Sequence, residues 1–578
     1  MNLRRSAAAA LVVYAALVMW LTWPLAAHLR TRLPDTRSPC RYDPLYMGWV
    51  LAWETHALGT APARLRDANI FHPARGTLFY GDTGFGALPY FMPPMLAGGN
   101  PTLALNLLFL GCIAATACSL HLVVVCWTGS ELAGFIAGWT FLTTRWVLWD
   151  FVPTAPSYAV LQYFPWIVYL AARPARRLGQ SLRLLPLVVL QCLTDVVYVA
   201  ASVLAPLGLL SLGRLFRRGS RAAGLRLLVT IGLVLAVLAP IYAAHLAVRD
   251  ANPDLARQTI WRFTLLPTSL PWGPIAMRFQ SPATVTVVSL LLIATGAVLR
   301  LLEPGARRGR GQGEEAPAPG LAWRACCLWV VAGLVFSLSP SLYWYKTPIN
   351  LPPLVVSFVT PLYQVVRSPE RLRIASLVGL SLLAGLAFAQ CARRLPARGR
   401  LAPATRPLLA AAIAAAMYAQ YAGGILVPAA VGARPLPHVY PLAAAITGRS
   451  PIDHLLARSD GPLLELPVGS GSDLFAPTSH ARAMYRSVFH WRPLLNGYDS
   501  YWPAGFAERM VLASRLPDPA ALAALRDETS VELLLVHLSG LQPSQRAAWL
   551  ALTDSPRRDD LRLAGRDGDD LLFEVRGR

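Results

Sequence analysis

Long apolar stretches separated by short polar segments occupy the first three quarters of the chain. The first stretch runs from Ala7 to about Ala27, and others lie near positions 102–126, 131–149, 157–172, 183–196, 198–213, 226–245, 283–301, 324–340, 371–390 and 407–428. Stretches of about 17–25 apolar residues can cross a hydrocarbon core of ~30 Å, so the pattern predicts about eleven transmembrane helices. We therefore expect a polytopic α-helical membrane domain over residues 1–428.

The pattern changes after about residue 428. Residues 463–468 and 531–536 form short apolar runs typical of buried strands, and residues 571–575 form another after the turn Asp567-Gly568-Asp569. Residues 519–527 have the pattern of a helix. The alternation predicts a C-terminal α/β domain over residues 429–578.

Composition supports a membrane protein and excludes a nucleic-acid-binding one. Of the 578 residues, 55% are hydrophobic and 15% are charged, and the mean hydropathy is +0.44. A soluble protein carries nearer a quarter charged residues. The formal net charge is +22, but the arginines form short clusters between apolar stretches. A nucleic-acid site needs instead a basic face on a soluble domain.

The positions of these clusters predict the orientation of the chain. Arginine-rich segments follow four of the five even-numbered stretches, at Arg173–Arg183, Arg214–Arg226, Arg300–Arg324 and Arg393–Arg406, and only the tight Cys126–Glu131 turn carries no positive charge. Basic loops stay on the cytoplasmic side of a membrane. We expect a multi-pass protein of the inner (plasma) membrane with a cytoplasmic N-terminus. Its long first loop, residues 28–100, and the C-terminal domain would then be non-cytoplasmic.

Asp43 is the first candidate for chemistry. It follows the first apolar stretch, at the outer edge of the bilayer, where an enzyme with a lipid-carried substrate needs a general base or metal ligand. The apolar residues after it recur at three- and four-residue spacing, which predicts a helix along the membrane interface. A plain amphipathic connector with interfacial aromatic residues is the alternative.

Further candidates lie in both outer regions. Substrate-binding candidates are Glu54, His56, His72 and Asp82 in the first loop, Arg367 and Arg371 before a late stretch, and His490, Trp491, Asn496 and Tyr498 in the C-terminal domain. Arginine suits a phosphate through bidentate hydrogen bonds. Membrane anchoring by the arginines, an ordinary His-Pro turn and a well-packed loop are the respective alternatives.

Asp150 is the candidate partner of Asp43 in a metal site. It lies in the second outer loop, and two carboxylates can hold a divalent cation through oxygen ligands. The alternative is a helix-end residue in a short loop. The sequence therefore allows a divalent cation and does not require any cofactor.

The order of these motifs resembles that of polytopic membrane glycosyltransferases of the GT-C fold, including their bacterial YfhO-like relatives. The resemblance covers the whole chain, through short motifs that are individually weak. They are Asp43-Pro44 with Trp49, Trp53-Glu54 with His56, Asn69-Ile70-Phe71-His72-Pro73, Gly99-Asn100-Pro101 with Asn106, Val366-Arg367-Ser368-Pro369-Glu370-Arg371, Glu465-Leu466-Pro467-Val468 and His490-Trp491-Arg492-Pro493-Leu494-Leu495-Asn496-Gly497-Tyr498.

The resemblance implies transfer of a sugar, hexosyl or pentosyl, from a polyprenyl-phosphate donor. The acceptor would be an envelope glycan, lipid or protein on the outer face. An acidic residue of the first outer loop acts as general base or metal ligand in such enzymes, and Asp43 matches that place. No paired acidic motif adjoins Asp43, which is a departure from the family pattern.

Two other functions fit parts of the sequence. A non-catalytic scaffold or accessory protein of the same fold would tolerate the loss of Asp43. A transporter of lipid-linked glycans would have ionisable residues and broken helices near the membrane midplane, whereas few charges lie deep in these stretches.

Overall fold

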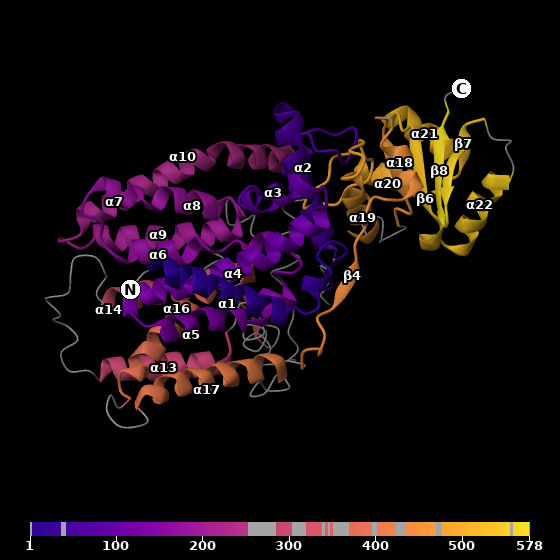
Figure 1. The fold of residues 1–578 in the computed structure, drawn as a ribbon. Helices are drawn as coiled ribbons and strands as arrows, with labels where there is room; N and C mark the ends of the chain where they lie inside the picture. The colour runs from indigo at the N-terminus through magenta and orange to yellow at the C-terminus, as the bar shows by residue number, and fades with distance from the viewer. Residues whose placement is uncertain are drawn as a thin grey trace.

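A computed structural model describes residues 3–35, 42–251, 285–302, 319–337, 341–344, 347–350, 369–395, 402–423, 435–458, 460–469, 477–554 and 559–576. Its helices lie roughly side by side in one large bundle, and a smaller α/β unit stands at one end of that bundle (Figure 1).

The bundle contains a set of apolar helices that run along its length. They are α1 (Leu3–Leu21), α4 (Pro101–Thr128), α5 (Glu131–Leu142), α6 (Phe164–Ala172), α7 (Leu178–Leu182), α8 (Leu184–Cys192), α9 (Tyr198–Leu215), α10 (Arg221–Ala251), α13 (Val287–Leu301), α14 (Pro319–Phe336), α16 (Ile374–Ala392) and α17 (Ala402–Gly423). Four helices among the described residues are long and apolar enough to span a membrane by themselves: Pro101–Thr128, Tyr198–Leu215, Arg221–Ala251 and Arg371–Ala392.

Several predicted spans are shorter or broken as helices. The stretch at 131–149 is helical only to Leu142, where the hydroxyls of Thr143 and Thr144 bond to carbonyls four residues back and a π-helical turn, Trp146–Asp150, follows. The stretch at 157–172 begins with a short 3₁₀ turn, Pro156–Ala159, and becomes α6 only at Phe164. The structure supports a multi-helix membrane fold, and the number eleven stays a prediction.

The α/β unit has a four-stranded sheet in the order β5-β6-β8-β7, formed by Leu463–Leu466, Leu533–His537, Asp570–Val575 and Leu561–Asp567. β5 and β6 are parallel, and the other pairs are antiparallel. The strands expected near 463–468, 531–536 and 571–575 are β5, β6 and β8, and the expected helix is α21 (Pro519–Thr529). The boundary expected at 428/429 lies outside the described residues.

Helices α18 (Pro451–Leu456), α19 (Pro477–Ser487), α20 (Phe506–Ser514), α21 and α22 (Pro543–Asp554) surround this sheet (Figure 1). The first outer loop contributes α2 (Asp43–Thr60) and α3 (Leu88–Gly98). Two antiparallel two-stranded sheets complete the strands. β1 (Arg32–Pro34) pairs with β4 (Leu442–Ala444) from far along the chain, and β2 (Ser341–Trp344) pairs with the neighbouring β3 (Thr347–Asn350).

A joint of backbone hydrogen bonds ties the first outer loop to the sheet. The amides of Leu494 and His72 donate to the carbonyls of Asn69 and Leu494, both at 2.8 Å. On its other edge the same segment pairs with β5, since the amide of Leu495 donates to Leu463 O at 2.9 Å. The loop segment 69–72 and the segment 492–496 therefore extend the sheet toward the bundle.

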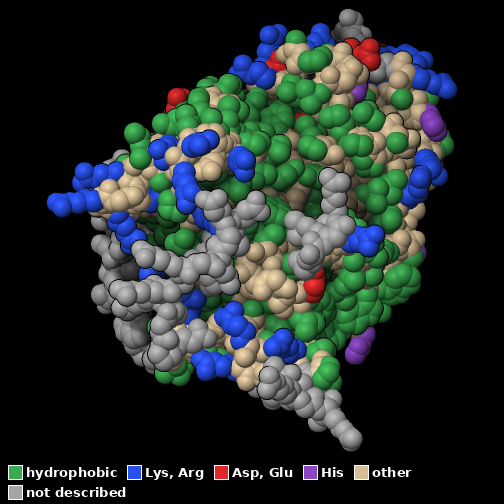
Figure 2. Space-filling model, turned by 60° about the vertical axis from the view of Figure 1, so that its left-hand side comes forward, with side chains coloured by type: hydrophobic (Ala, Val, Ile, Leu, Met, Phe, Trp, Pro, Cys, Tyr) green, Lys and Arg blue, Asp and Glu red, His purple; other side chains and the backbone are tan. Residues whose placement is uncertain are grey.

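Basic side chains gather at the opposite end of the bundle. The turn between α9 and α10 carries Arg214, Arg217, Arg218 and Arg221, and it lies with the N-terminus away from the sheet (Figure 1). Figure 2 brings that end forward and shows many arginine side chains with few acidic ones among them. The sheet and the arginine-rich turns thus occupy opposite ends, as the predicted orientation requires; the assignment of the ends to the two sides of the membrane stays a prediction.

Asn496 makes the joint sensitive to a single substitution. Its Oδ1 accepts from the Glu465 amide at 2.8 Å, and its Nδ2 donates to the Glu465 carbonyl at 2.9 Å, with the side chain fully buried. Because Asn496→Ala leaves two buried backbone groups unpaired, we expect a loss of about 2–4 kcal/mol in the free energy of unfolding. Thermal unfolding in detergent measures it. Gln542→Ala, at an exposed amide on the same unit, is the control; equal melting temperatures for the two variants would contradict the role given to Asn496.

Candidate functional site

A cavity of about 610 Å³ opens between α9, α10 and the two outer segments. Its outer end is formed by residues 80–82 of the first loop, by Ser500 and Tyr501 of the C-terminal unit, and by Arg371. The amide of Tyr501 donates to Tyr80 O at 3.1 Å, which holds the two outer segments together at the cavity. The cavity therefore combines residues from the bundle, the loop and the C-terminal unit.

The chemistry of the lining changes along the cavity. Its inner part is apolar, with Ala201, Leu204 and Ala205 from α9 and Ile231 and Leu235 from α10. Its outer part carries the ionisable side chains Asp82, His245, Arg249 and Arg371. From Ile231 to Arg249 the α10 axis rises by about 27 Å at 1.5 Å per residue. The cavity thus suits a long molecule with an apolar chain and a charged head.

Arg371 is held in place by aromatic rings. It belongs to the 3₁₀ turn η7 (Pro369–Arg373) before α16, and its guanidinium lies 4.8 Å from the Phe151 ring centroid and 5.0 Å from that of Tyr198. Asp82 and Asp195 both act on it electrostatically. Stacked guanidinium groups keep their hydrogen-bond donors free at the edges of the plane. Arg371 and Asp82, which the sequence offered as separate candidates, lie together.

Asp195 stabilises the charged end of the cavity through hydrogen bonds to the start of α9 and to Tyr158. The sequence places it in a short turn between apolar stretches, and in the structure its Oδ1 accepts from the amides of Val197 and Tyr198 at 2.9 and 2.6 Å. Tyr158 donates its hydroxyl to Asp195 Oδ2. The carboxylate thereby begins α9 and fixes the Tyr198 ring on which Arg371 rests.

Asp43 is the first residue of α2 and is half-buried. Its Oδ1 accepts from the Tyr498 hydroxyl at 3.0 Å. A carboxylate in the first turn of a helix is stabilised in its ionised form by the helix dipole. The structure thus brings Asp43 together with Tyr498, the two candidates that the sequence placed furthest apart.

A polar cluster connects Asp43 with the cavity. Tyr498 meets the ring of Tyr46 at 5.8 Å, edge to face, and Tyr46 donates its hydroxyl to Asp499 Oδ1 at 2.9 Å. Gly81, the neighbour of Asp82, packs directly against that hydrogen bond. Tyr46 and Asp499 were not among the sequence candidates. The Tyr498-Asp499-Ser500-Tyr501 run was the available signal, because it places a carboxylate between candidate aromatic residues.

The remaining candidate residues of the first loop and the C-terminal unit make contacts with other residues of the chain. The His56 ring stacks on Trp491 with centroids 4.1 Å apart, and His72 Nε2 lies 3.2 Å from Thr529 O. His490 Nδ1 accepts from the amide of Arg492 at 3.1 Å. Together with the hydrogen bonds from Asn496 to Glu465 of β5, these contacts form a packed joint between the first loop and the C-terminal unit. A substrate-binding role for them stays a prediction.

The helix predicted along the interface is present as α2, but it is largely buried. Trp49 is fully buried and donates Nε1–H to Asn69 Oδ1 at 3.0 Å, and α19 packs along the helix. The sequence pattern predicted that one face of this helix lies on the membrane surface. In the structure the C-terminal unit covers the helix instead.

Asp150 lies at the end of the π-helical turn that follows α5. It is exposed and interacts with Arg145, whose Nε–H donates to Tyr421 O of α17. Among the described residues, no three His, Cys, Asp or Glu side chains are placed to hold a metal ion. A cation held by Asp43 and Asp150 stays a prediction. Arg367 lies outside the described residues.

Glu54 is a buried acid beside the cluster. It is fully buried in α2, its Oε1 accepts from the Gly84 amide at 2.9 Å, and its Oε2 has no hydrogen-bond partner among the described residues. Burial raises the pKa of Glu54 to about 8, against the opposing effect of the Gly84 hydrogen bond. Near neutral pH the side chain is therefore protonated.

Comparison with known proteins adds one finding about the fold. Neither a described protein family nor a curated protein matches the sequence. Among solved structures, the chain is similar to the arabinofuranosyltransferase AftD from Mycobacteria, with a TM-score of 0.55 and 17% identity over all of this chain. The chain therefore shares its fold with this part of AftD. The chain spans 40% of the longer AftD chain, and the YfhO-like assignment stays a prediction.

Gly81 gives a test of the polar cluster beside the cavity. A Cβ at Gly81 would lie 1.5 Å from Asp499 Oδ1 and 2.5 Å from the Tyr46 hydroxyl. Gly81→Ala must break the Tyr46–Asp499 hydrogen bond, so we expect a melting temperature lower by several degrees, since 1–3 kcal/mol is a usual cost of such a rearrangement. Gly59→Ala, on α2 with nothing within 4 Å of the added Cβ, is the control. Equal stabilities would mean that the cluster is loosely packed.

Glu54 predicts a pH dependence of stability. Its pKa is raised, so the folded state holds a proton that the unfolded state releases, and stability falls as pH rises from about 4.5 to 8. Glu54→Gln mimics the protonated acid. We expect the variant to gain in melting temperature relative to the wild type between pH 5 and pH 9. Glu508→Gln, at an exposed acid, is the control; a difference between Glu54→Gln and wild type that stays constant with pH would refute the assignment.

Proposed function

We propose that this chain is a membrane glycosyltransferase that moves a sugar, hexosyl or pentosyl, from a polyprenyl-phosphate donor to an envelope acceptor on the non-cytoplasmic face. The observation that carries the proposal is the cavity, which joins an apolar channel between α9 and α10 to a charged outer end. The GT-C fold supports it.

The donor fits the cavity by its chemistry. An isoprenoid chain matches the apolar inner lining, and its length requires a channel that follows membrane helices. The phosphate belongs at the outer end, beside Arg371 and Arg249. A guanidinium binds phosphate oxygens bidentately, and here Arg371 is oriented beforehand by Phe151 and Tyr198. The sugar would then point toward Asp82, Ser500 and Tyr501.

The transfer needs a base for the acceptor. The acceptor hydroxyl oxygen attacks the anomeric carbon, the bond from that carbon to the phosphate oxygen breaks, and the polyprenyl phosphate leaves with the electron pair. A carboxylate takes the hydroxyl proton. Asp43 is the proposed base or metal ligand, by the family resemblance. Asp82 is the second candidate, because its side chain lines the cavity.

Substitutions of the two carboxylates test the proposal. Asp43→Asn and Asp82→Asn keep size and polarity but cannot accept the proton, so loss of the true base should lower transfer about 10²–10⁴-fold. Lipid-linked and envelope glycans of a deletion strain complemented with each variant are profiled by mass spectrometry. Asp527→Asn, at an exposed acid of α21, is the control.

The pattern of results separates the hypotheses. A defect in Asp43→Asn alone assigns the base to Asp43, and a defect in Asp82→Asn alone assigns it to Asp82. Unchanged glycans in both variants, where full deletion changes them, would favour a non-catalytic scaffold of the same fold. Unchanged glycans in the deletion strain would refute a role in glycan transfer.

A further inference from the structure

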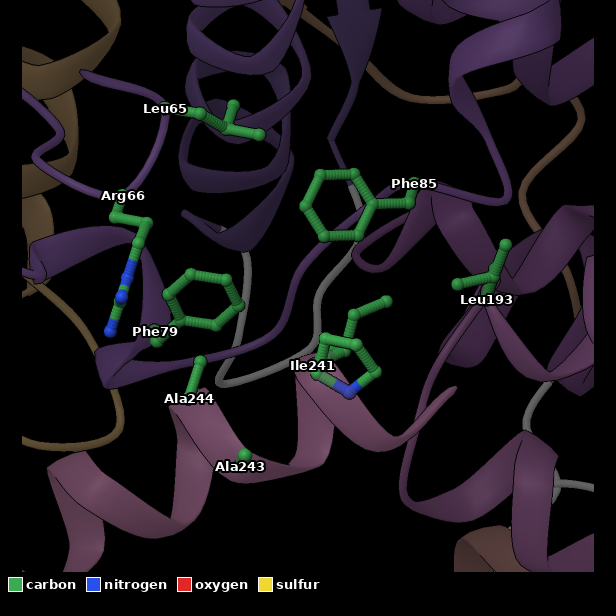
Figure 3. A pocket seen from close by; sticks show the side chains of 9 residues that line it. Leu65, Arg66, Phe79, Phe85, Leu193, Ile241, Ala243 and Ala244 are labelled. Atoms are coloured by element: carbon green, nitrogen blue, oxygen red, sulfur yellow. The ribbon is translucent and has the colours of Figure 1, made fainter. Parts of the chain in front are cut away.

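A second cavity of about 600 Å³ lies against the opposite side of α10. Figure 3 shows Phe79, Phe85, Leu193 and Ile241 around it, with the Arg66 side chain beside Phe79. Arg66 supplies the charge, while the other described side chains of its lining are apolar. The walls come from α10, from the first loop that also carries Asp82, and from Leu193 at the end of α8.

The two cavities share a thin wall. Phe79 lines the second cavity and its neighbour Tyr80 lines the first, while on α10 Ala244 lines the second and His245 the first. The Phe79 and His245 rings meet edge to face at 5.1 Å and close the wall. Molecules in the two cavities would thus reach the outer surface on either side of the segment from Phe79 to Asp82.

The second cavity is placed for a molecule that enters from the membrane. Its α10 wall belongs to an apolar helix of which only 28% is buried, compared with 94% for Arg371–Ala392. Arg66 and Arg64 are both exposed on the outer side, and Arg66 faces the cavity. An apolar pocket beside lipid with a guanidinium at its outer end fits a lipid with an anionic head, since each such charge attracts acidic head groups.

We infer that the second cavity holds the acceptor of the transfer, and that this acceptor is a lipid with an anionic head group. This inference rests on the proposed function and narrows its acceptor to one class. The acyl or isoprenoid chain lies against α10 and Phe85, the head lies at Arg66, and its hydroxyl reaches the donor sugar across the segment from Phe79 to Asp82. The hydroxyl proton passes to the base carboxylate, as in the reaction above.

Photo-labelling tests occupancy without any assay of transfer. The full chain in nanodiscs is irradiated with phosphatidylglycerol that carries a diazirine on one acyl chain, and labelled peptides are identified by mass spectrometry. We expect labels on residues 77–85 and on α10 near Ala243. Ala243→Trp fills the cavity from an exposed helix position and should remove these labels. Ala236→Trp, on the same face of α10 but lining neither cavity, should keep them.

A second pair of variants tests the contact with the head group at two exposed positions. Arg66→Ala should lower the preference for phosphatidylglycerol over a diazirine phosphatidylcholine by about fivefold, because one guanidinium near the head group is removed. Arg64→Ala, at the neighbouring exposed arginine outside the cavity, should leave it unchanged. Equal labelling of the two lipids, or of Ala243→Trp and wild type, would overturn the inference.

Glycan profiles decide whether the bound lipid is the acceptor. In the complemented deletion strain, Ala243→Trp should lose the product, and that product should be extracted with organic solvent as a glycolipid. Ala205→Trp, which fills the first cavity, should lose the same product. A product found only in the water-soluble envelope fraction, or one that Ala243→Trp still makes, would mean a structural phospholipid only and would overturn the acceptor assignment. A deletion strain with unchanged glycans would instead refute the proposed function itself.

Discussion

The pairing of residues 69–72 with residues 492–496 is the constraint on which the site depends. These segments are 423 positions apart at Asn69 and Arg492, where the Asn69 side chain donates from Nδ2 to the Arg492 carbonyl at 2.9 Å. On one side the pairing continues into β5, and on the other Asn69 accepts from Trp49 of α2. A buried backbone must have its hydrogen bonds satisfied, so the loop and the sheet fix each other's position.

The polar cluster follows from this arrangement. Once α2 is held against the C-terminal unit, Asp43 meets Tyr498, and Tyr46 meets Asp499. The same unit presents Ser500 and Tyr501 to the cavity, while Arg371 comes from the turn before α16. Each carboxylate of the cluster therefore stands where the first loop meets the C-terminal unit.

Much of the architecture could be predicted, because the length of an apolar stretch and the pattern of apolar residues in a strand are local properties of the sequence. The main strands of the sheet and α21 match the sequence pattern, and the membrane helices follow the apolar stretches. The ends of α5 and α6 could not be predicted, since threonine side chains and a π-helical turn redirect the backbone within an apolar stretch. Neither could the burial of α2, which depends on α19 from far along the chain.

The candidate site could be predicted only in part, because its residues come together through contacts between distant parts of the chain. Asp82 and Arg371 were named as candidates, and the structure places them in one cavity. His72, His490 and Asn496 were named as substrate-binding candidates. A sequence does not distinguish a polar side chain that binds a sugar from one that binds a buried backbone group. Asp499, Tyr46, His245 and Arg249 escaped notice, because their significance appears only when the two outer segments meet.

The joint also has a consequence for biogenesis. Contacts between distant parts of a chain form after local ones, because closing a long loop costs entropy that only the completed contact repays. The membrane helices can insert as they are synthesised, but the face of α2 that packs on α19 stays uncovered until the C-terminal unit has been synthesised. A nascent chain released before that point would have inserted membrane helices, but its first loop would lack the hydrogen bonds to the C-terminal unit. The joint would thus be completed late, after synthesis of the C-terminal unit, and truncation before residue 492 would leave the first loop without it.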